Sequence, residues 1–224
     1  MNERTLLITG GTGGLGTTVV ARLARDYRCV VLFNSQDGFD ALRKDVPGVD
    51  GVQADLSDEE SVRAAIAQAC ERSGALYGLV HLAGGYAAGR VSQTPTETWQ
   101  RMIGLNLTAS FVVVREALAT MKRDAPGRIV AISSDATLSR AAGSAAYTIS
   151  KSGLNLLIEL TAAELTGSGI TANALLPGTL DTAASRKAMP DARRVPLDSV
   201  AEAIAFLLSD AASRISGALI PLEA

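Results

Sequence analysis

Short apolar runs alternate with longer amphipathic stretches along almost the whole of this 224-residue sequence. The apolar runs are rich in β-branched side chains, which is typical of buried strands, and the amphipathic stretches have helical spacing. We expect strands over 4–9, 29–33, 49–54, 76–82, 127–133, 170–176 and 217–222. We expect helices over 17–27, 59–72, 94–122, 143–165 and 200–208. This alternation predicts an α/β fold with one doubly wound parallel sheet of about seven strands and helices on both faces.

The chain is expected to form a single domain over residues 1–224. Its length falls in the usual range for one domain, and a hydrophobic content of 47% is enough for one sizeable core. We find no shift in composition, no low-complexity linker and no internal repeat that would divide it. All candidate functional residues should therefore meet on one sheet.

Charge and cysteine patterns exclude several functions. With 21 basic and 23 acidic residues and no long Lys/Arg run, nucleic acid is not an expected partner. Cys29 and Cys70 lie far apart without metal-ligand spacing, which indicates reduced thiols. Residues 1–20 reach a glycine-rich turn too early for a signal peptide or a membrane span, so we expect a cytoplasmic protein without a membrane partner.

A glycine-rich turn, Gly10–Gly16, follows the first expected strand and precedes a helix. Glycines allow a positive φ and close approach of a pyrophosphate, and a helix N-terminus offers N–H donors to an anion. The pattern is typical of a Rossmann-type nucleotide-binding fold. A tight turn that only packs a helix on a sheet is the alternative.

The ends of the second and third strands bear on cofactor choice. Asn34 and Ser35 stand where such folds distinguish cofactors, and neither is the acidic residue that would repel a 2′-phosphate nor the arginine that would attract it. The pattern leans towards NADP or dual use with NAD. Asp37 is expected either to cap the next helix or to contact a ribose. Asp55, followed by Leu56, either accepts from an adenine amino group or serves as a loop or cap residue.

Further candidates follow other strands at the same edge. Ala83–Gly85 follow the fourth strand, Ser134 the fifth, and Pro177-Gly178 the sixth, and parallel sheets bind ligands beyond these ends. His81, the single histidine, is expected to be a structural residue rather than a base. One histidine offers no metal site, and none is expected.

Tyr147 and Lys151 are four residues apart in an expected helix, so they stand on one face. A lysine beside a phenol favours the phenolate, which makes Tyr147 a candidate proton donor and acceptor. Taken alone, the pair has the alternative of a chance spacing on an exposed helix face. Asn106 lies in the middle of another expected helix, although asparagine is a poor interior helix residue. It is therefore either simply exposed or opens the helix locally to hold something.

Together these residues resemble the short-chain dehydrogenase/reductase family over essentially the whole chain. The motifs of that family match these parts of the sequence: the glycine turn (Thr9–Gly16), Asp55, Asn106, Ser134, the Tyr147/Lys151 pair, and the segment from Pro177 to Thr182. His81 departs from them, because the family usually has asparagine there. The resemblance implies these cofactor-binding residues: Gly10, Thr12, Gly13, Gly14, Leu15, Gly16, Asn34, Ser35, Asp55, Leu56, Ala83, Gly84, Gly85, Tyr147, Lys151, Pro177, Gly178, Leu180 and Thr182.

The resemblance also implies a mechanism, hydride transfer between a nicotinamide ring and a small carbonyl or alcohol substrate. Ser134 would hydrogen-bond the substrate oxygen and Tyr147 would supply or remove its proton. Lys151 would lower the Tyr147 pKa and bind the nicotinamide ribose, and Asn106 would hold a water linking Lys151 to solvent. A nucleotide-sensing module that has lost catalysis is the alternative from another class.

A narrower resemblance concerns substrate and assembly. Residues 83–89 and 179–190 look like segments of dihydropteridine reductases, which implies a pterin-like substrate and a small lid. That branch prefers NADH, with aspartate in place of Asn34, and lacks an equivalent of Ser134. In the broad family the helices at 96–122 and 146–165 form a dimer interface, so a homodimer or homotetramer is expected. The alternative is packing of the small and aliphatic residues of these helices on their own sheet.

Overall fold

The computed structural model describes residues 4–122 and 124–223, so the predicted domain is covered apart from residues 1–3, 123 and 224. The described residues form one seven-stranded sheet in which neighbouring strands run parallel, in the order β3-β2-β1-β4-β5-β6-β7. The strands are β1 (Thr5–Thr9), β2 (Arg28–Phe33), β3 (Asp50–Gln53), β4 (Gly78–His81), β5 (Gly127–Ile132), β6 (Ile170–Pro177) and β7 (Leu219–Leu222). The predicted doubly wound sheet is therefore confirmed.

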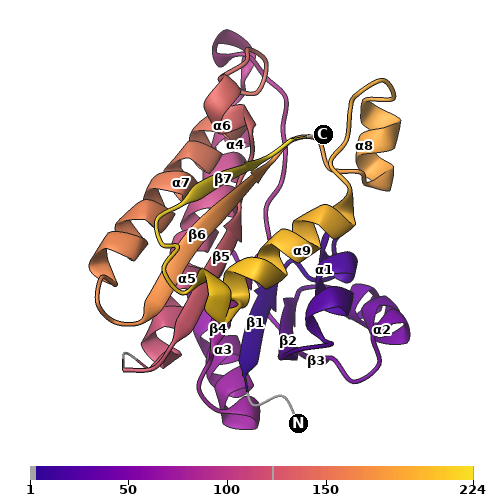
Figure 1. The fold of residues 1–224 in the computed structure, drawn as a ribbon. Coiled ribbons are helices and arrows are strands. Elements are labelled where there is room, and N and C mark those ends of the chain that lie inside the picture. The colour runs from indigo at the N-terminus through magenta and orange to yellow at the C-terminus, as the bar shows by residue number, and fades with distance from the viewer. Residues whose placement is uncertain (1–3, 123, 224) are drawn as a thin grey trace.

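Helices cover both faces of the sheet (Figure 1). They are α1 (Gly16–Leu23), α2 (Gln36–Asp45), α3 (Glu59–Ser73), α4 (Thr96–Ile103), α5 (Ala109–Thr120), α6 (Ala136–Ser139), α7 (Ala145–Glu164), α8 (Ala183–Ala188) and α9 (Leu197–Leu208). Side chains of β1 alternate between two core layers. Leu6 and Ile8 pack with α1, α2 and α9, whereas Leu7 packs with α3, α5 and α7. Burial on both faces explains why the strands read as continuous apolar runs.

The strand order reverses at β1, which lies between β2 and β4. Connections leave the carboxyl ends of β1 and β4 in opposite directions along the sheet, and a crevice opens between them. Gly10 follows β1 and Leu82 follows β4, so the glycine turn lies at this crevice. The fold thereby places the candidate functional residues together.

The expected helix over 94–122 is interrupted. It consists of α4 and α5 joined by a π-helical turn, Gly104–Thr108, and Asn106 in that turn is fully buried. Of the two interpretations of Asn106, simple exposure is wrong and local opening of the helix is correct. Single π-turns inside α-helices are frequent at functional sites.

The segment between β6 and Pro196 contains the short helix α8, which is not among the helices expected from the sequence. A capping box begins this helix: Thr182 Oγ1 accepts from the Ser185 amide, and Ser185 Oγ accepts from the Thr182 amide, each at 3.1 Å. At α2, Ser35 caps the helix by accepting from the Gly38 amide at 3.4 Å. Asp37 lies in the first turn of α2, so its expected role as cap is wrong.

By length and composition, the continuous helical stretch Thr96–Thr120 could span a membrane, with a mean hydropathy of 1.4. In this structure its π-turn and α4 pack on α7, and α5 packs on α3. Its remaining apolar side chains include the exposed residues Trp99, Leu105 and Phe111. The apolar side chains of this stretch therefore divide into two sets: some pack within a globular domain, and others form an exposed face.

Candidate active site at the carboxyl edge of the sheet

A cavity of about 540 Å³ lies over the glycine turn, beyond β1, β2 and β3. Its lining includes most of the residues expected to hold the adenosine and pyrophosphate parts of a dinucleotide: Gly10, Thr12, Gly13, Gly14, Leu15, Gly16, Asn34, Asp55, Leu56, Ala83 and Gly84. Ser35 does not line it, because its hydroxyl caps α2. Phe33 and Ser57 line it without having been predicted.

Two glycines of the turn leave space that other residues would fill. Gly10 has a φ of +70°, and a Cβ on it would lie 2.7 Å from the Ala83 amide nitrogen, so only glycine lets the two loops meet. A Cβ on Gly14 would lie 3.2 Å from the Thr182 side chain. The turn is therefore shaped as a cradle at the start of α1, which fits the pyrophosphate of a dinucleotide.

Asp55 is exposed at the far end of this cavity, and one of its oxygens is already engaged. Oδ1 accepts from the Ser57 amide at 2.8 Å and from the Ser57 hydroxyl at 2.6 Å. These bonds lower the pKa of the Asp55 carboxyl. The residue thus orders its own loop, as one of its two interpretations predicted, and it lines the cavity. Its contact with an adenine amino group stays a prediction.

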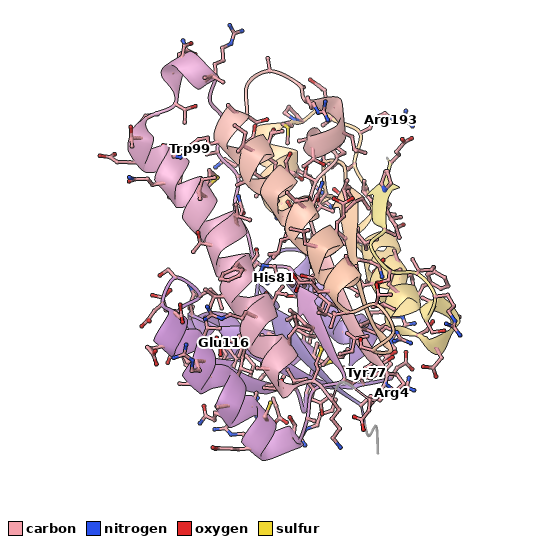
Figure 2. The ribbon with its side chains drawn as sticks, turned by 90° about the vertical axis from the view of Figure 1, so that its left-hand side faces the viewer. Arg4, Tyr77, His81, Trp99, Glu116 and Arg193 are labelled. Atoms are coloured by element: carbon pink, nitrogen blue, oxygen red, sulfur yellow. The ribbon has the colours of Figure 1, made fainter. Side chains whose placement is uncertain are left out.

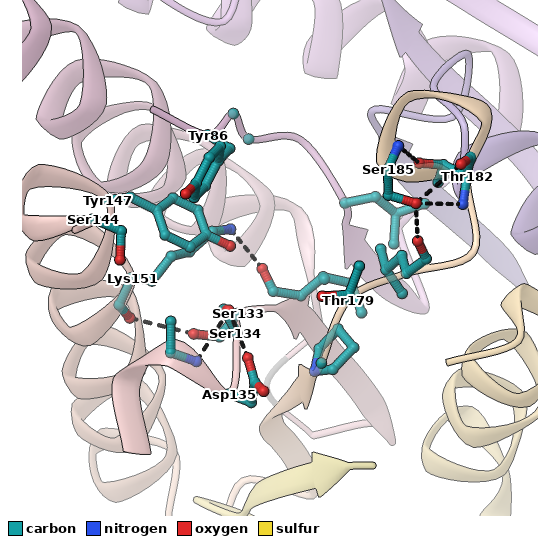
Figure 3. A pocket seen from close by; sticks show the side chains of 18 of the residues that line it. Tyr86, Ser133, Ser134, Asp135, Ser144, Tyr147, Lys151, Thr179, Thr182 and Ser185 are labelled. Atoms are coloured by element: carbon teal, nitrogen blue, oxygen red, sulfur yellow. Dashed lines mark hydrogen bonds between the residues drawn. The ribbon is translucent and has the colours of Figure 1, made fainter. Parts of the chain in front are cut away.

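A second cavity, also of about 540 Å³, adjoins the first at Leu82 and Gly84. Figure 3 shows Tyr147 and Lys151 on one side of it, Ser134 on the β5 loop, and Thr179 and Thr182 on the opposite side. Its lining includes these predicted residues: Gly85, Ser134, Tyr147, Lys151, Pro177, Gly178, Leu180 and Thr182. The structure therefore brings the predicted substrate and nicotinamide residues together beside the glycine cavity.

Lys151 projects from α7 into the interior and is 4% exposed. Its Nζ donates to the Ile132 carbonyl oxygen at 2.8 Å. Burial lowers the pKa of Lys151 to about 8. An ammonium has three N–H donors, so this side chain keeps donors for a ligand in the cavity.

The expected lowering of the Tyr147 pKa by Lys151 is not found in the free protein. Burial raises the pKa of Tyr147, a hydrogen bond with Ser134 opposes that rise, and the nearby Asp135 carboxylate adds to it. The physical reason is that desolvation of the phenolate dominates while Lys151 donates to the strand carbonyl. Tyr147 and Ser134 line the same cavity, which agrees with the predicted grouping of these two side chains.

Asn106 lies behind the glycines that separate the two cavities. Its Oδ1 accepts from the Gly85 amide at 2.8 Å, and its Nδ2 donates to the Gly85 carbonyl and to Ser150 Oγ, each at 3.0 Å. A Cβ on Gly84 would lie 2.8 Å from Asn106 Oδ1 and 3.0 Å from Lys151 Nζ. Asn106 and Lys151 therefore approach the same glycine from within the protein.

His81 is buried at the end of β4 and both ring nitrogens have partners. Nδ1 lies 2.8 Å from Thr9 Oγ1 and Nε2 lies 2.8 Å from Ser110 Oγ. Burial, with the nearby charge of Lys151, lowers the pKa of His81 to about 3. The structure thus agrees with the expectation of a structural, neutral histidine.

Some lining residues were not named singly as candidates, although Tyr86, Ser185 and Met189 fall in segments 86–93 and 183–196, which the sequence indicates as the wall of the substrate pocket. Tyr86 packs edge-on against Tyr147 with ring centroids 5.0 Å apart, and Asp135 accepts from Ser134 Oγ at 3.3 Å. Ser144, Ser185 and Met189 complete this part of the wall. Adjacency to Ser134 could have indicated Asp135, whereas Tyr86 depends on how its loop folds back. Within residues 4–122 and 124–223, no three His, Cys, Asp or Glu side chains gather as a metal site.

The fold, the glycine cradle and the adjoining cavity define a nucleotide-binding α/β oxidoreductase. The family model for short chain dehydrogenases matches residues 4–193, and the chain belongs to that family. It is 31% identical over 232 residues to the 3-oxoacyl-(acyl-carrier-protein) reductase MabA of Mycobacterium bovis, covering 99% of this chain and 92% of that protein. It is an NAD(P)-dependent oxidoreductase that transfers a hydride between the nicotinamide and its substrate.

Two solved structures support the assignment. A short-chain dehydrogenase/reductase from Mycobacterium ulcerans superposes with a TM-score of 0.93 at 28% identity, covering 100% of this chain and 89% of that one. The actinorhodin polyketide ketoreductase with NADPH gives a TM-score of 0.90 at 27% identity, covering 98% and 95%. These comparisons favour the broad family and favour neither the dihydropteridine reductase branch nor a non-catalytic nucleotide-sensing module.

Proposed function

We propose that the chain interconverts a small carbonyl compound and its alcohol in the second cavity, with Tyr147 as the proton donor and acceptor and Ser134 as the group that holds the substrate oxygen. The observation that carries this proposal is the meeting of Ser134, Tyr147 and Lys151 in one cavity that adjoins the glycine cradle. A substrate oxygen between the two hydroxyls would be held and protonated by groups that line the same cavity.

Lys151 and Asn106 support that chemistry. The free donors of Lys151 would bind the nicotinamide ribose and place a positive charge near the phenol during proton transfer. Asn106, next to Lys151 across Gly84, would hold the water that joins Lys151 to solvent. When bound, a nicotinamide dinucleotide supplies or accepts the hydride, and the glycine turn, Asp55 and Thr182 would hold it.

For the cofactor we propose NADPH, with NADH also accepted. Asn34 is exposed at the end of β2 and lacks the carboxylate that would repel a 2′-phosphate. The similarity to a ketoreductase solved with NADPH supports the same preference. An Asn34→Asp variant should shift the ratio of kcat/KM values towards NADH, and an Asn34→Arg variant should shift it towards NADPH. An unchanged ratio in both variants would contradict a role for Asn34.

The test of function is turnover measured by nicotinamide absorbance over a panel of small ketones, 3-oxoacyl thioesters and a quinonoid dihydropterin. Tyr147→Phe should lower kcat by about two to four powers of ten, because it removes the positioned acid and base, while cofactor affinity stays nearly unchanged. Wild-type turnover in this variant would reject the assignment. Stabilisation by nucleotide without turnover on any substrate would instead support the sensing module.

We also propose a homodimer formed by the exposed face of the α4–α5 and α7 helices. The aliphatic residues of α7 divide between two surfaces: Leu154 and Ala162 are buried on the protein's own sheet, whereas Leu156 and Leu160 are about half exposed. Trp99, Phe111 and Ile149 extend the exposed set. An apolar surface of this kind is typical of a subunit interface.

Sedimentation velocity of the whole chain tests the assembly. The wild type should sediment as a dimer or a tetramer, and Leu160→Glu should shift it towards monomer because a charge on the interface must be desolvated. The matched control is Leu138→Glu, an exposed leucine on α6 outside this face. A wild-type monomer would overturn the proposal.

We place the protein in the cytoplasm. Support comes from Cys29, which is buried, and Cys70, which is partly buried, because both are free thiols. Cell fractionation with a tagged full-length chain would test this, and recovery from an extracytoplasmic fraction would overturn it.

A further inference from the structure

His81 connects two elements that frame the active site. It is 0% exposed, and its ring lies between Thr9 at the end of β1 and Ser110 in α5. Figure 2 shows His81 in the interior, beside the helix that follows the π-turn. The family asparagine has a shorter side chain and a single amide head, so the imidazole is a departure that needs its own explanation.

The direction of the hydrogen bonds around His81 follows from the proton count. Ser110 Oγ donates to the Asn106 carbonyl oxygen at 2.7 Å, and a hydroxyl has one proton to give. His81 Nε2 must therefore carry a proton and donate it to Ser110 Oγ. The neutral ring then has an acceptor at Nδ1, which receives the proton of the Thr9 hydroxyl.

The chain of bonds continues beyond Asn106. Asn106 Nδ2 donates to Ser150 Oγ at 3.0 Å, and Ser150 Oγ donates to the Tyr147 carbonyl oxygen at 2.8 Å. Bonds with one direction thus run from Thr9 through His81 and Ser110 to Asn106, and then to the residue with the proposed catalytic phenol. The chain touches no solvent-exposed side chain before it reaches α7, because His81, Asn106, Ser110 and Ser150 are all 0% exposed.

This chain of hydrogen bonds passes through the π-turn, because Asn106 is one of its members. Asn106 is fixed at its carbonyl by Ser110 and at its side chain by Gly85 and Ser150. The bond from Ser110 comes from within the same helix, four residues on, whereas those to Gly85 and Ser150 come from other segments. Lys151 Nζ and Asn106 Oδ1 both approach Gly84, so a shift of Asn106 would change the surroundings of Lys151.

We propose that His81 is a positioning residue. As an Nε2–H imidazole it donates to Ser110 Oγ and so directs the Ser110 hydroxyl to the Asn106 carbonyl in the π-turn, which fixes the positions of Asn106 and Tyr147 relative to Lys151. This inference rests on the proposed function, since the relative positions of Asn106, Tyr147 and Lys151 matter only if these residues act together. It gives a reason for the ring at this position, because its two nitrogens reach partners on different elements.

The first experiment observes the ring directly. His81 is the only histidine in the sequence, so the ring signals of ¹⁵N-labelled protein need no assignment. A long-range ¹H–¹⁵N spectrum should show the neutral Nε2–H tautomer, unchanged between about pH 5 and 8, the range in which an ordinary histidine titrates. A neutral Nδ1–H ring, or one that titrates in this range, would overturn the inference whatever the activity of the protein.

The second experiment removes the link between the ring and the π-turn. Ser110→Ala should lower kcat by roughly ten- to a hundred-fold, as expected when catalytic groups are misplaced, with the Kd for the reduced cofactor within about two-fold of wild type. Thr161→Val is the matched control, because Thr161 is a buried α7 hydroxyl that also donates to a carbonyl four residues back, at 2.7 Å from Leu157 O. The control should keep wild-type kcat.

The outcomes separate this inference from the proposed function. If the Ser110→Ala protein is folded and keeps the wild-type kcat and the wild-type pH dependence of kcat, the hydrogen bonds through His81 only support the fold. A wild-type protein that binds cofactor but turns over no substrate would count against the proposed function, while the tautomer would still be decided by the spectrum.

Discussion

Among the described residues, Arg128 is buried at the amino edge of the sheet and Lys151 at the carboxyl edge, and the hydrogen-bond partners of the two cations differ. At the amino edge Arg128 is 1% exposed, donates to the Gly127 carbonyl at 2.8 Å, and reaches the Gly169 and Ser209 carbonyls at 3.4 Å. At the carboxyl edge the ammonium group of Lys151 has one hydrogen bond among the described residues, to the Ile132 carbonyl oxygen. The arginine is enclosed by protein partners, whereas the lysine stands beside a cavity with donors left over.

This difference shows what each cation can contribute. Arg128 also lies over the Tyr77 ring, with its guanidinium carbon 5.8 Å from the centroid, and Arg4 lies over the same ring at 4.6 Å. Figure 2 shows Arg4 and Tyr77 together, away from His81. A buried cation whose donors are bound to protein groups stabilises the fold, whereas a buried cation with unused donors can bind a ligand. We therefore expect substitutions at Arg128 to affect stability and substitutions at Lys151 to affect turnover.

The largest expected effect is that of Lys151→Met. Turnover should fall by about two to four powers of ten, the range of positioned groups in proton transfer, and cofactor affinity should fall with it. Thermal stability should be unchanged or higher, because a buried ammonium with a depressed pKa is replaced by an apolar chain of similar length. Steady-state kinetics and a melting curve measure both. A marked loss of stability would show that Lys151 is mainly a structural cation.

The opposite pattern is expected at the amino edge. Arg128→Met keeps the length of the side chain but leaves the carbonyl oxygens of Gly127, Gly169 and Ser209 without this donor. The free energy of unfolding should fall by about 2–4 kcal/mol, as for the loss of one partner from a buried charged group. Urea unfolding measures this. With the protein still folded, kcat should remain that of the wild type, and a specific loss of kcat would contradict the division between the two edges.

The pH dependence of stability sharpens the comparison. In the unfolded chain Lys151 has its ordinary pKa near 10.5, and burial lowers it to about 8 in the folded state. Between these values the unfolded state binds more protons, so stability rises with pH. The contribution of Lys151 should rise by on the order of 1–2 kcal/mol between pH 8 and 10. Above about pH 9 the Cys29 thiol opposes it, because burial raises the folded pKa of Cys29 from 9.0 to about 12. Above about pH 10, Tyr27, Tyr77 and Tyr147, whose folded pKa values are raised, oppose it.

The control for the pH effect is the same titration on Lys151→Met. Between pH 8 and 10 the stability of the variant should gain less with rising pH than that of the wild type, since methionine does not titrate and Cys29 is present in both proteins. Arg128→Met should keep the wild-type slope. Melting temperatures across this range are sufficient to decide. An equal slope in wild type and Lys151→Met would assign the effect to other groups.

Sequence reasoning recovered the sheet because the apolar runs of β1, β4, β5 and β6 are buried on both faces, and it located the site because parallel strands end at one edge. It could not recover the environment of Tyr147, because the pKa of the phenol depends on how far the β5 loop and Tyr86 enclose it. The bonds of His81 to Thr9 and Ser110 depend on three segments that meet only in the fold. The position of Asn106 could be predicted in part. A poor helix former within a helix indicated a local opening, and the π-turn confirms it.

The smallest expected effect is that of Asp210→Asn at the amino edge. Asp210 pairs with Arg4 at 3.0 Å and lies 3.8 Å from Arg128, but its side chain is 69% exposed. An exposed ion pair is screened by water and salt, so the loss should be below about 1 kcal/mol. The carbonyl oxygens that accept from Arg128 remain in this variant. If urea unfolding instead gave a loss as large as that of Arg128→Met, the carboxylate rather than the carbonyl cage would hold the arginine, and the amino edge would depend on an ion pair.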